Sequence, residues 1–238
     1  MNEILGRVLE IVRYPVKSMA GERMPVAELD WQGLEGDRQY GLVRRQNTTR
    51  FPWLTARDFS GLVLYRATYD DPECPRTSKV TVVAPDGMSL SLNDPGLIAA
   101  LEAEAGEPLN LMQLGIGAYD LMPVSIVTTA SLKKLDAVHG ASLDRRRFRT
   151  NIIVESDCLD EAWQGQRIGF GEAGGAELLI AYGAPRCAMI TIDPDTATRD
   201  AKVLRTVAQR FGNAFTMYAS VARPGVLREG DEVRIVGP

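Results

Sequence analysis

The sequence predicts a mainly β protein with a few short helices, of the α+β class. Short runs of β-branched and aromatic residues recur along the chain, and most lie between glycine, proline or aspartate turn signals. Three short segments carry helical patterns or helix start and stop signals. Short strands with short helices between them favour barrel-like β architecture over a doubly wound sheet.

The first half of the chain contains four expected strands and one expected helix. The strands are expected at residues 4–14, 40–43, 62–69 and 79–84. A turn over residues 84–87, Ala-Pro-Asp-Gly, follows the last of them. A helix is expected over residues 96–105, because Pro95 suits a first helical turn and Gly106 follows the last turn.

The second half contains more short strands and two expected helices. The strands are expected at residues 124–128, 151–155, 177–182, 188–192, 215–222 and 226–236. Helices are expected over residues 130–138 and over 199–211, where apolar residues share one face at helical spacing. A glycine-rich connection near residues 115–117 separates the two halves. We therefore expect two domains, residues 1–115 and residues 116–238.

Composition excludes several classes of function. The chain has 238 residues and a formal net charge of −4, which argues against general attraction to nucleic acid or membrane surfaces. No apolar stretch reaches the ~20 residues of a membrane span. The N-terminus lacks the uninterrupted apolar core of a secretory signal. We expect a cytoplasmic protein without nucleic-acid or membrane partners.

Cysteine and histidine usage narrows the metal chemistry. Cys74, Cys158 and Cys187 are odd in number and far apart, so they form neither a disulfide framework nor a CxxC zinc motif. His139 is the single histidine, which excludes a histidine-rich metal site. It is expected at a helix C-terminus, where a cation complements the helix dipole.

Two motifs in the first half carry candidate binding residues. The segment Tyr-Pro-Val-Lys-Ser at residues 14–18 follows the first strand, and its proline ends the ladder. Lys17 at that strand end either binds a phosphate as a point charge or is a solvated surface lysine. In residues 33–38 two glycines allow a tight turn that presents Asp37 and Arg38, either as a site or as a surface ion pair.

The third motif is a dense arginine cluster over residues 144–151, Asp-Arg-Arg-Arg-Phe-Arg-Thr-Asn. Four arginines within five positions are a candidate anion site, and a basic turn that contacts nothing is the alternative. Alternation in an extended chain would place on one side Arg145, Arg147, Arg149 and Asn151, and on the other Arg146 and Phe148.

The fourth motif surrounds Cys187. This cysteine lies between a glycine-proline loop and an apolar segment, and Arg186 precedes it. A neighbouring cation favours a thiolate, the form that ligates soft metals or attacks sulfur. An inert buried cysteine is the alternative. Cys74, in a polar loop, and Cys158, between acidic residues, are interpreted as incidental.

Taken together, these segments resemble the MOSC family, named for the C-terminal domain of molybdenum cofactor sulfurases, and within it the amidoxime-reducing subgroup. The resemblance rests on six motifs in the expected order, namely YPVKS, GDR, TTASL, RFRTNI, DEAW and the RC…DPDT run. It implies a β-barrel-like MOSC domain preceded by a smaller N-terminal β-barrel domain.

The resemblance also implies a molybdenum–pyranopterin cofactor and a role for each matching residue. Cys187 matches the catalytic cysteine that ligates molybdenum. Arg149 and Asn151 match residues at the pterin and phosphate end, and Lys17 and Arg38 match basic residues near the same group. Thr128 and Ser131, in TTASL, match positions that could donate hydroxyl hydrogen bonds.

The implied activity is the two-electron reduction of small N-hydroxylated compounds, such as hydroxylamines or amidoximes. The clustered cysteines of a ferredoxin domain, which some relatives carry, are missing. Electrons are therefore expected from separate proteins, a flavin reductase and a small electron carrier. Pyridoxal phosphate binding is not expected, because the chain is too short for the large domain it requires. Two alternatives stay open, a sulfur carrier with a Cys187 persulfide and a non-catalytic cofactor binder.

Overall fold

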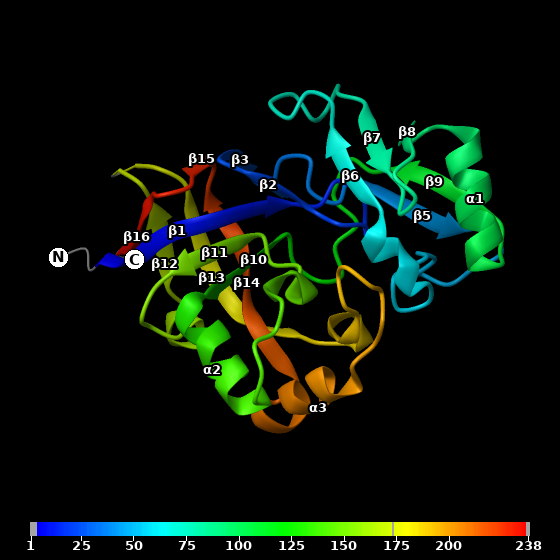
Figure 1. Cartoon of the computed structure of the whole chain (residues 1–238). Coiled ribbons are helices and arrows are strands. Elements are labelled where there is room, and N and C mark those ends of the chain that lie inside the picture. The colour runs from blue at the N-terminus through cyan, green and yellow to red at the C-terminus, as the bar shows by residue number, and fades with distance from the viewer. Residues whose placement is uncertain (1–3, 173, 237–238) are drawn as a thin grey trace.

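Strands make up most of the regular structure in the computed structural model, which describes residues 4–172 and 174–236. Figure 1 shows two lobes, a larger one and a smaller one, and both lobes carry helices. The helices are α1 (Pro95–Ala105), α2 (Thr129–His139) and α3 (Ala201–Arg210). The expected mainly β class with a few short helices is confirmed. No helix in the described part of the chain is long and apolar enough to cross a membrane.

The larger lobe is built on one sheet that closes on itself. Its strands are β1 (Ile4–Arg13), β2 (Glu22–Met24), β10 (Val124–Thr128), β11 (Ile152–Glu155), β12 (Arg167–Phe170), β13 (Glu177–Pro185), β14 (Ala214–Arg223) and β16 (Glu232–Val236). They follow the order β11-β10-β14-β13-β12-β16-β1-β2. β1 also pairs antiparallel with β11, with Val8 opposite Val154, and this pairing completes a ring. The β10–β11 pair is parallel.

The first strand belongs to this ring and not to the smaller lobe. The buried apolar residues of β1 include Val8 and Ile11, which join the same buried core as Trp163 and Phe170. A three-stranded sheet also joins the two halves of the sequence. In it β3 (Val26–Asp30) pairs with β4 (Gly33–Leu34) from the first half and with β15 (Gly225–Arg228) from the second half. The start of the chain is therefore packed against its second half.

The smaller lobe consists of two short sheets and one helix around a separate core. β5 (Tyr40–Arg44) pairs with β9 (Leu109–Gln113), and β6 (Arg66–Tyr69), β7 (Val80–Val83) and β8 (Ser89–Ser91) form the other sheet. The α1 helix begins as expected, with the Asp94 side chain accepting a hydrogen bond from the backbone N–H of Gly96. Leu97 and Leu101 are the buried residues on the inner face of α1.

Two helices cover one side of the ring. Thr128 caps α2 and Asp200 caps α3, each through a side-chain oxygen that accepts a backbone N–H. The two helices contact each other and share a third buried core with Phe148. His139 ends α2 as expected, with its Nδ1 3.1 Å from Oγ1 of Thr206.

Three expected strands are wrong in part. Residues 62–69 divide into the 3₁₀ helix η1 (Ser60–Leu64) and β6, and the segment after Cys187 is the 3₁₀ helix η4 (Ala188–Thr191). The arginine cluster is the 3₁₀ helix η2 (Arg145–Phe148), because the Asp144 side chain accepts from the Arg146 N–H and starts a turn. The last expected strand is two strands, β15 and β16. The pattern also missed η3 (Asp160–Trp163), which holds the DEAW motif.

Candidate functional site

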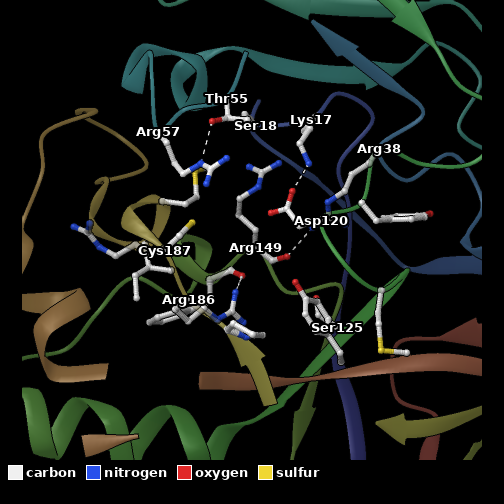
Figure 2. Close-up of a pocket in the computed structure, with 18 of the residues that line it drawn as sticks. Lys17, Ser18, Arg38, Thr55, Arg57, Asp120, Ser125, Arg149, Arg186 and Cys187 are labelled. Atoms are coloured by element: carbon white, nitrogen blue, oxygen red, sulfur yellow. Dashed lines mark hydrogen bonds and ion pairs between the residues drawn. The ribbon is translucent and has the colours of Figure 1, made fainter. Parts of the chain in front are cut away.

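A pocket lies where the end of β1, the connection before β10, the segment after η2 and the end of β13 meet. The side chains that line it and carry charge or polar groups include Lys17, Ser18, Arg38, Arg57, Asp120, Ser125, Arg147, Arg149, Asn151, Arg186 and Cys187. Figure 2 shows Lys17 and Arg38 on one side, Cys187 on the other, and Arg149 between them. Five residues singled out from separate motifs of the sequence therefore share one pocket: Lys17, Arg38, Arg149, Asn151 and Cys187.

Lys17 is a buried cation with one acidic partner. The chain leaves β1 at Pro15, and the Lys17 N–H donates to the carbonyl oxygen of Tyr40 at 2.8 Å. Its Nζ donates to the carbonyl oxygen of Ala118 and to Oδ1 of Asp120, each at 2.6 Å. Burial lowers the pKa of Lys17, and the Asp120 carboxylate opposes that shift. The lysine is therefore not the solvated surface residue of the alternative reading.

The Gly-Asp-Arg turn holds the Arg38 side chain in place through Asp37. Asp37, which is 1% exposed, accepts the Tyr14 N–H at 2.8 Å and forms an ion pair with Arg38. The Arg38 guanidinium then donates to the carbonyl oxygen of Arg149 at 3.0 Å. It also lies 4.8 Å from the centre of the Tyr14 ring. The alternative of a surface ion pair is therefore wrong, because the pair is buried and orients a cation of the pocket.

Arg149 is the central cation of the pocket. Its Nη1 donates to the carbonyl oxygen of Met19 at 2.6 Å, and its guanidinium lies 4.2 Å from the centre of the Tyr14 ring. Its Nη2 is buried and has no hydrogen-bond partner in the described structure. Burial lowers the pKa of Arg149 to about 10. A buried guanidinium with an unused donor is suited to an anionic ligand.

Three residues that line the pocket have a strained backbone conformation. Ser18, Arg38 and Arg149 all line the pocket and have left-handed φ angles of 71°, 53° and 51°. Residues other than glycine rarely adopt this region, and such strain is typical of functional sites. Arg149 is the left-handed residue at which η2 ends, and its side chain lines the pocket. This backbone geometry replaces the extended segment that the sequence predicted.

Cys187 lies partly exposed at the edge of the pocket, where β13 ends and η4 begins. The side chain of the neighbouring Arg186 forms hydrogen bonds within the protein. Its Nε donates to the carbonyl oxygen of Phe215 at 2.7 Å and its Nη1 to that of Phe148 at 3.1 Å. Burial lowers the pKa of Arg186 to about 10. Cys74 and Cys158 are exposed and do not line this pocket.

Asn151 lines the pocket, but its amide is used within the protein. Its Oδ1 accepts from the N–H and from Oγ of Ser125, both at 3.1 Å. Its Nδ2 donates to the carbonyl oxygen of Val12 at 3.2 Å. The side chain thereby ties β1, β10 and β11 together beneath the cations. We interpret Asn151 as a residue that positions the pocket wall.

Thr128 and Ser131 are not brought to this pocket. The Oγ1 of Thr128 caps α2 by accepting the Ser131 N–H at 3.2 Å. The Ser131 hydroxyl donates to the buried carboxyl group of Asp160 in η3. The TTASL and DEAW motifs therefore meet each other and stabilise the fold. This corrects their expected role as hydrogen-bond donors in the cofactor site.

Sequence reasoning missed several lining residues, among them Arg57, Asp120 and Ser125. Arg57 lies in the turn that precedes η1, and Asp120 lies in an irregular connection, so neither carries a pattern signal. Asp120 is the one carboxylate among the lining residues described here, against six cationic side chains. Arg147 is neutralised by Asp193, whose Oδ2 lies 2.7 Å from its Nη2. The surplus of positive charge makes the pocket suited to an anionic ligand.

The fold and the pocket define a mainly β protein with a thiol at the rim of a cationic cleft. The MOSC domain model matches residues 116–234, and the MOSC N-terminal beta barrel domain model matches residues 5–113. The chain belongs to the MOSC-domain family.

Several relatives are similar over parts of the chain. Human mitochondrial amidoxime reducing component 2 is 32% identical over 48% of this chain and 37% of its own length. Human mitochondrial amidoxime-reducing component 1 is 24% identical over 98% of this chain and 84% of its own length. The molybdenum cofactor sulfurase of Bombyx mori is 30% identical over 56% of this chain and 16% of its own length. The chain thus spans little more than a third of the first of these relatives.

A solved structure shares the fold along the whole chain. The YuaD protein of Bacillus subtilis superposes with a TM-score of 0.53 and 15% sequence identity, covering 99% of this chain and 98% of that one. At this identity the likeness concerns the fold alone.

Proposed function

We propose that this protein binds the molybdenum–pyranopterin cofactor and uses it to reduce small N-hydroxylated compounds. One observation carries the proposal: the thiol of Cys187 and the unused buried donor of Arg149 face the same cationic pocket. A soft sulfur ligand and a phosphate-binding guanidinium are the two kinds of group that such a cofactor requires. The similarity to amidoxime reducing components supports the same function.

The donor set of the pocket fits this cofactor. Within the described residues, no group of three or more His, Cys, Asp or Glu side chains could hold a metal ion. A metal beside Cys187 must therefore bring most of its ligands with it, as a pterin-bound molybdenum does. Arg149 and Arg38, with Lys17, would hold the phosphate and pterin end, and Cys187 would hold the metal. The bound cofactor would supply the two-electron removal of an oxygen atom from substrate.

The protein's own residues prepare the pocket before any ligand enters. Asp37 and Tyr14 hold the Arg38 guanidinium, and Asn151 holds the strands beneath it. Because these contacts are formed within the fold, binding an anion here costs little reorganisation. Asp120 pairs with Lys17 and is more than half exposed, so it is free to move when an anion takes its place.

In the net reaction the N–O bond of the substrate breaks. An amidoxime, two electrons and two protons yield an amidine and water. The electrons would come from separate proteins, a flavin reductase and a small electron carrier.

A sulfur carrier is the second candidate. The partly exposed thiol of Cys187 and the similarity to a molybdenum cofactor sulfurase favour it. In this case Cys187 would carry a persulfide and the purified protein would hold no molybdenum.

Elemental analysis and pterin fluorescence on protein from a cofactor-producing host separate these candidates. The reductase predicts matching amounts of molybdenum and pterin, and conversion of benzamidoxime to benzamidine with a reduced viologen dye. Molybdenum and pterin without turnover would instead indicate a non-catalytic binder. Protein without either, but with a cyanide-labile sulfur on Cys187, would contradict the reductase and support the carrier.

A further inference from the structure

A second cavity of about 220 Å³ lies between the two lobes. Arg147, Arg149 and Met189 line both this cavity and the pocket of Cys187, so they form a shared wall. The cavity opens beside β2 and β6, which lie next to each other at the junction of the lobes (Figure 1). A backbone bridge between Ala20 and Arg66 holds the lobes together at this point. We call this space the interlobe cavity.

Much of the wall of the interlobe cavity is apolar. The apolar side chains come from β1, η1, β11, η4 and the segment after η4, and they include Val12, Val63, Ile153, Met189, Ile192 and Pro194. An apolar cavity of about 150 Å³ is large enough to hold benzene. The interlobe cavity is larger, and it therefore has room for a compact ring with one polar substituent.

A buried hydroxyl group faces this apolar space without a partner. Thr150 is 3% exposed, and its Oγ1 makes no hydrogen bond in the described structure. Thr150 lines the interlobe cavity but not the pocket of Cys187. Buried hydroxyls are nearly always satisfied, so this one points to a ligand or solvent atom in the cavity.

Most of the arginines around the cavity are already neutralised. Arg145 pairs with Glu10, Arg147 with Asp193, Arg23 with Glu229, and Arg146 with Asp144 and Asp195. Arg66, at the start of β6, lines the cavity and has no carboxylate partner among the described residues. Arg149 contributes charge from the shared wall and donates only to a backbone carbonyl. The unpaired positive charge matches a ligand with a single negative charge.

We propose that the interlobe cavity is a second small-molecule site, which binds a monocarboxylate with a compact apolar body. The carboxylate pairs with Arg66 and accepts a hydrogen bond from the Thr150 hydroxyl. The apolar body lies against the side chains from β1, η1 and β11. Since Arg149 belongs to the shared wall, a ligand in this site contacts the back of the proposed cofactor pocket.

Isothermal titration with benzoate tests this site on the full chain at low chloride. Benzoate should bind saturably, whereas benzamide, a neutral molecule of the same shape, should bind at least tenfold more weakly because a charged contact is worth about ten- to a hundredfold in affinity. Arg66→Gln should weaken benzoate by a similar factor. Arg57→Gln, which changes a cation of the Cys187 pocket only, is the matched control and should leave benzoate binding unchanged.

Thr150→Val gives a test that does not alter charge. It should weaken benzoate by about two- to tenfold, the range of one neutral hydrogen bond. The unliganded variant should melt at the same temperature or higher, because it buries no unpartnered hydroxyl. Absence of saturable benzoate binding, equal binding of benzamide, or loss of binding in Arg57→Gln and not in Arg66→Gln would each overturn the proposal. None of these outcomes depends on molybdenum.

Discussion

The Arg38 guanidinium donates to the carbonyl oxygen of Arg149 at 3.0 Å. This bond joins the Gly-Asp-Arg turn to the segment after η2, more than a hundred residues further along the chain. Both guanidiniums also lie against the ring of Tyr14, at 4.8 and 4.2 Å from its centre. The two cations are therefore held as one unit, and their spacing in the pocket is set before a ligand arrives.

Arg149→Ala should weaken cofactor binding by about ten- to a hundredfold, since a charged hydrogen bond is worth about 1.5–3 kcal/mol. Rebinding of released cofactor to the apoprotein measures the effect. Arg146→Ala is the matched control, because Arg146 is held at the surface by Asp144 and Asp195 and does not line the Cys187 pocket. Equal losses in the two variants would contradict the assignment of Arg149.

Asn151→Ala should destabilise the fold itself. It leaves the buried N–H of Ser125 and the carbonyl oxygen of Val12 without their partner, at a cost of about 2–4 kcal/mol in the free energy of unfolding. Urea unfolding of the apoprotein measures this cost, with Arg149→Ala as the comparison. A fully stable Asn151→Ala that has lost its cofactor would show that the amide binds the cofactor directly.

Asp160 should make stability depend on pH. Burial raises the pKa of this carboxyl from 3.8 to about 6, against the opposing hydrogen bond from Ser131. The folded protein then holds the proton more tightly than the unfolded chain. The contribution of Asp160 to the free energy of unfolding should therefore fall by about 3 kcal/mol as pH rises from about 4 to above 6.

Asp160→Asn removes the titrating group, so its stability relative to the unmodified chain should improve as pH rises through this range. Urea unfolding at pH 4.5 and pH 7.5 provides the comparison. The same difference between the two proteins at both pH values would show that Asp160 does not titrate there.

Electron supply should require a partner. With a nicotinamide alone, the purified chain should show no reduction of benzamidoxime, and the addition of a flavin reductase with a small electron carrier should restore turnover. The rate of benzamidine formation measures both conditions. Reduction driven by the nicotinamide without any added protein would refute the need for a separate donor.

Sequence patterns predicted the elements whose apolar residues pack into a core. β1, β10 and α3 appear near their expected bounds because their apolar faces point to a core. The 3₁₀ helix η4 was predicted as a strand, and the residues of η2 were considered as an extended segment. Short arginine or apolar runs have no period that distinguishes a single turn from an extended chain. The Asp144 cap that decides η2 is a single side-chain contact.

The residues of the candidate site could be predicted where they lie in a local sequence motif with a recognisable chemical role. Lys17, Arg38, Arg149 and Cys187 were identified from local sequence, and the structure places them around one pocket. Thr128 and Ser131 were assigned by resemblance, and the structure shows why this failed: their hydroxyls cap α2 and bind Asp160. Asp120 could not be predicted, because only the folded chain brings it to Lys17.

The molybdenum content of Cys187→Ser tests the account's central claim most directly. A hydroxyl is a poor ligand for a soft metal, so this variant should lose molybdenum when purified from a cofactor-producing host. Cys74→Ser and Cys158→Ser, which change exposed thiols outside the pocket, should retain as much as the unmodified chain. The melting temperature should confirm that the Cys187→Ser apoprotein is folded. A serine variant with stoichiometric molybdenum and full reductase activity would contradict the assignment of Cys187 as the metal ligand.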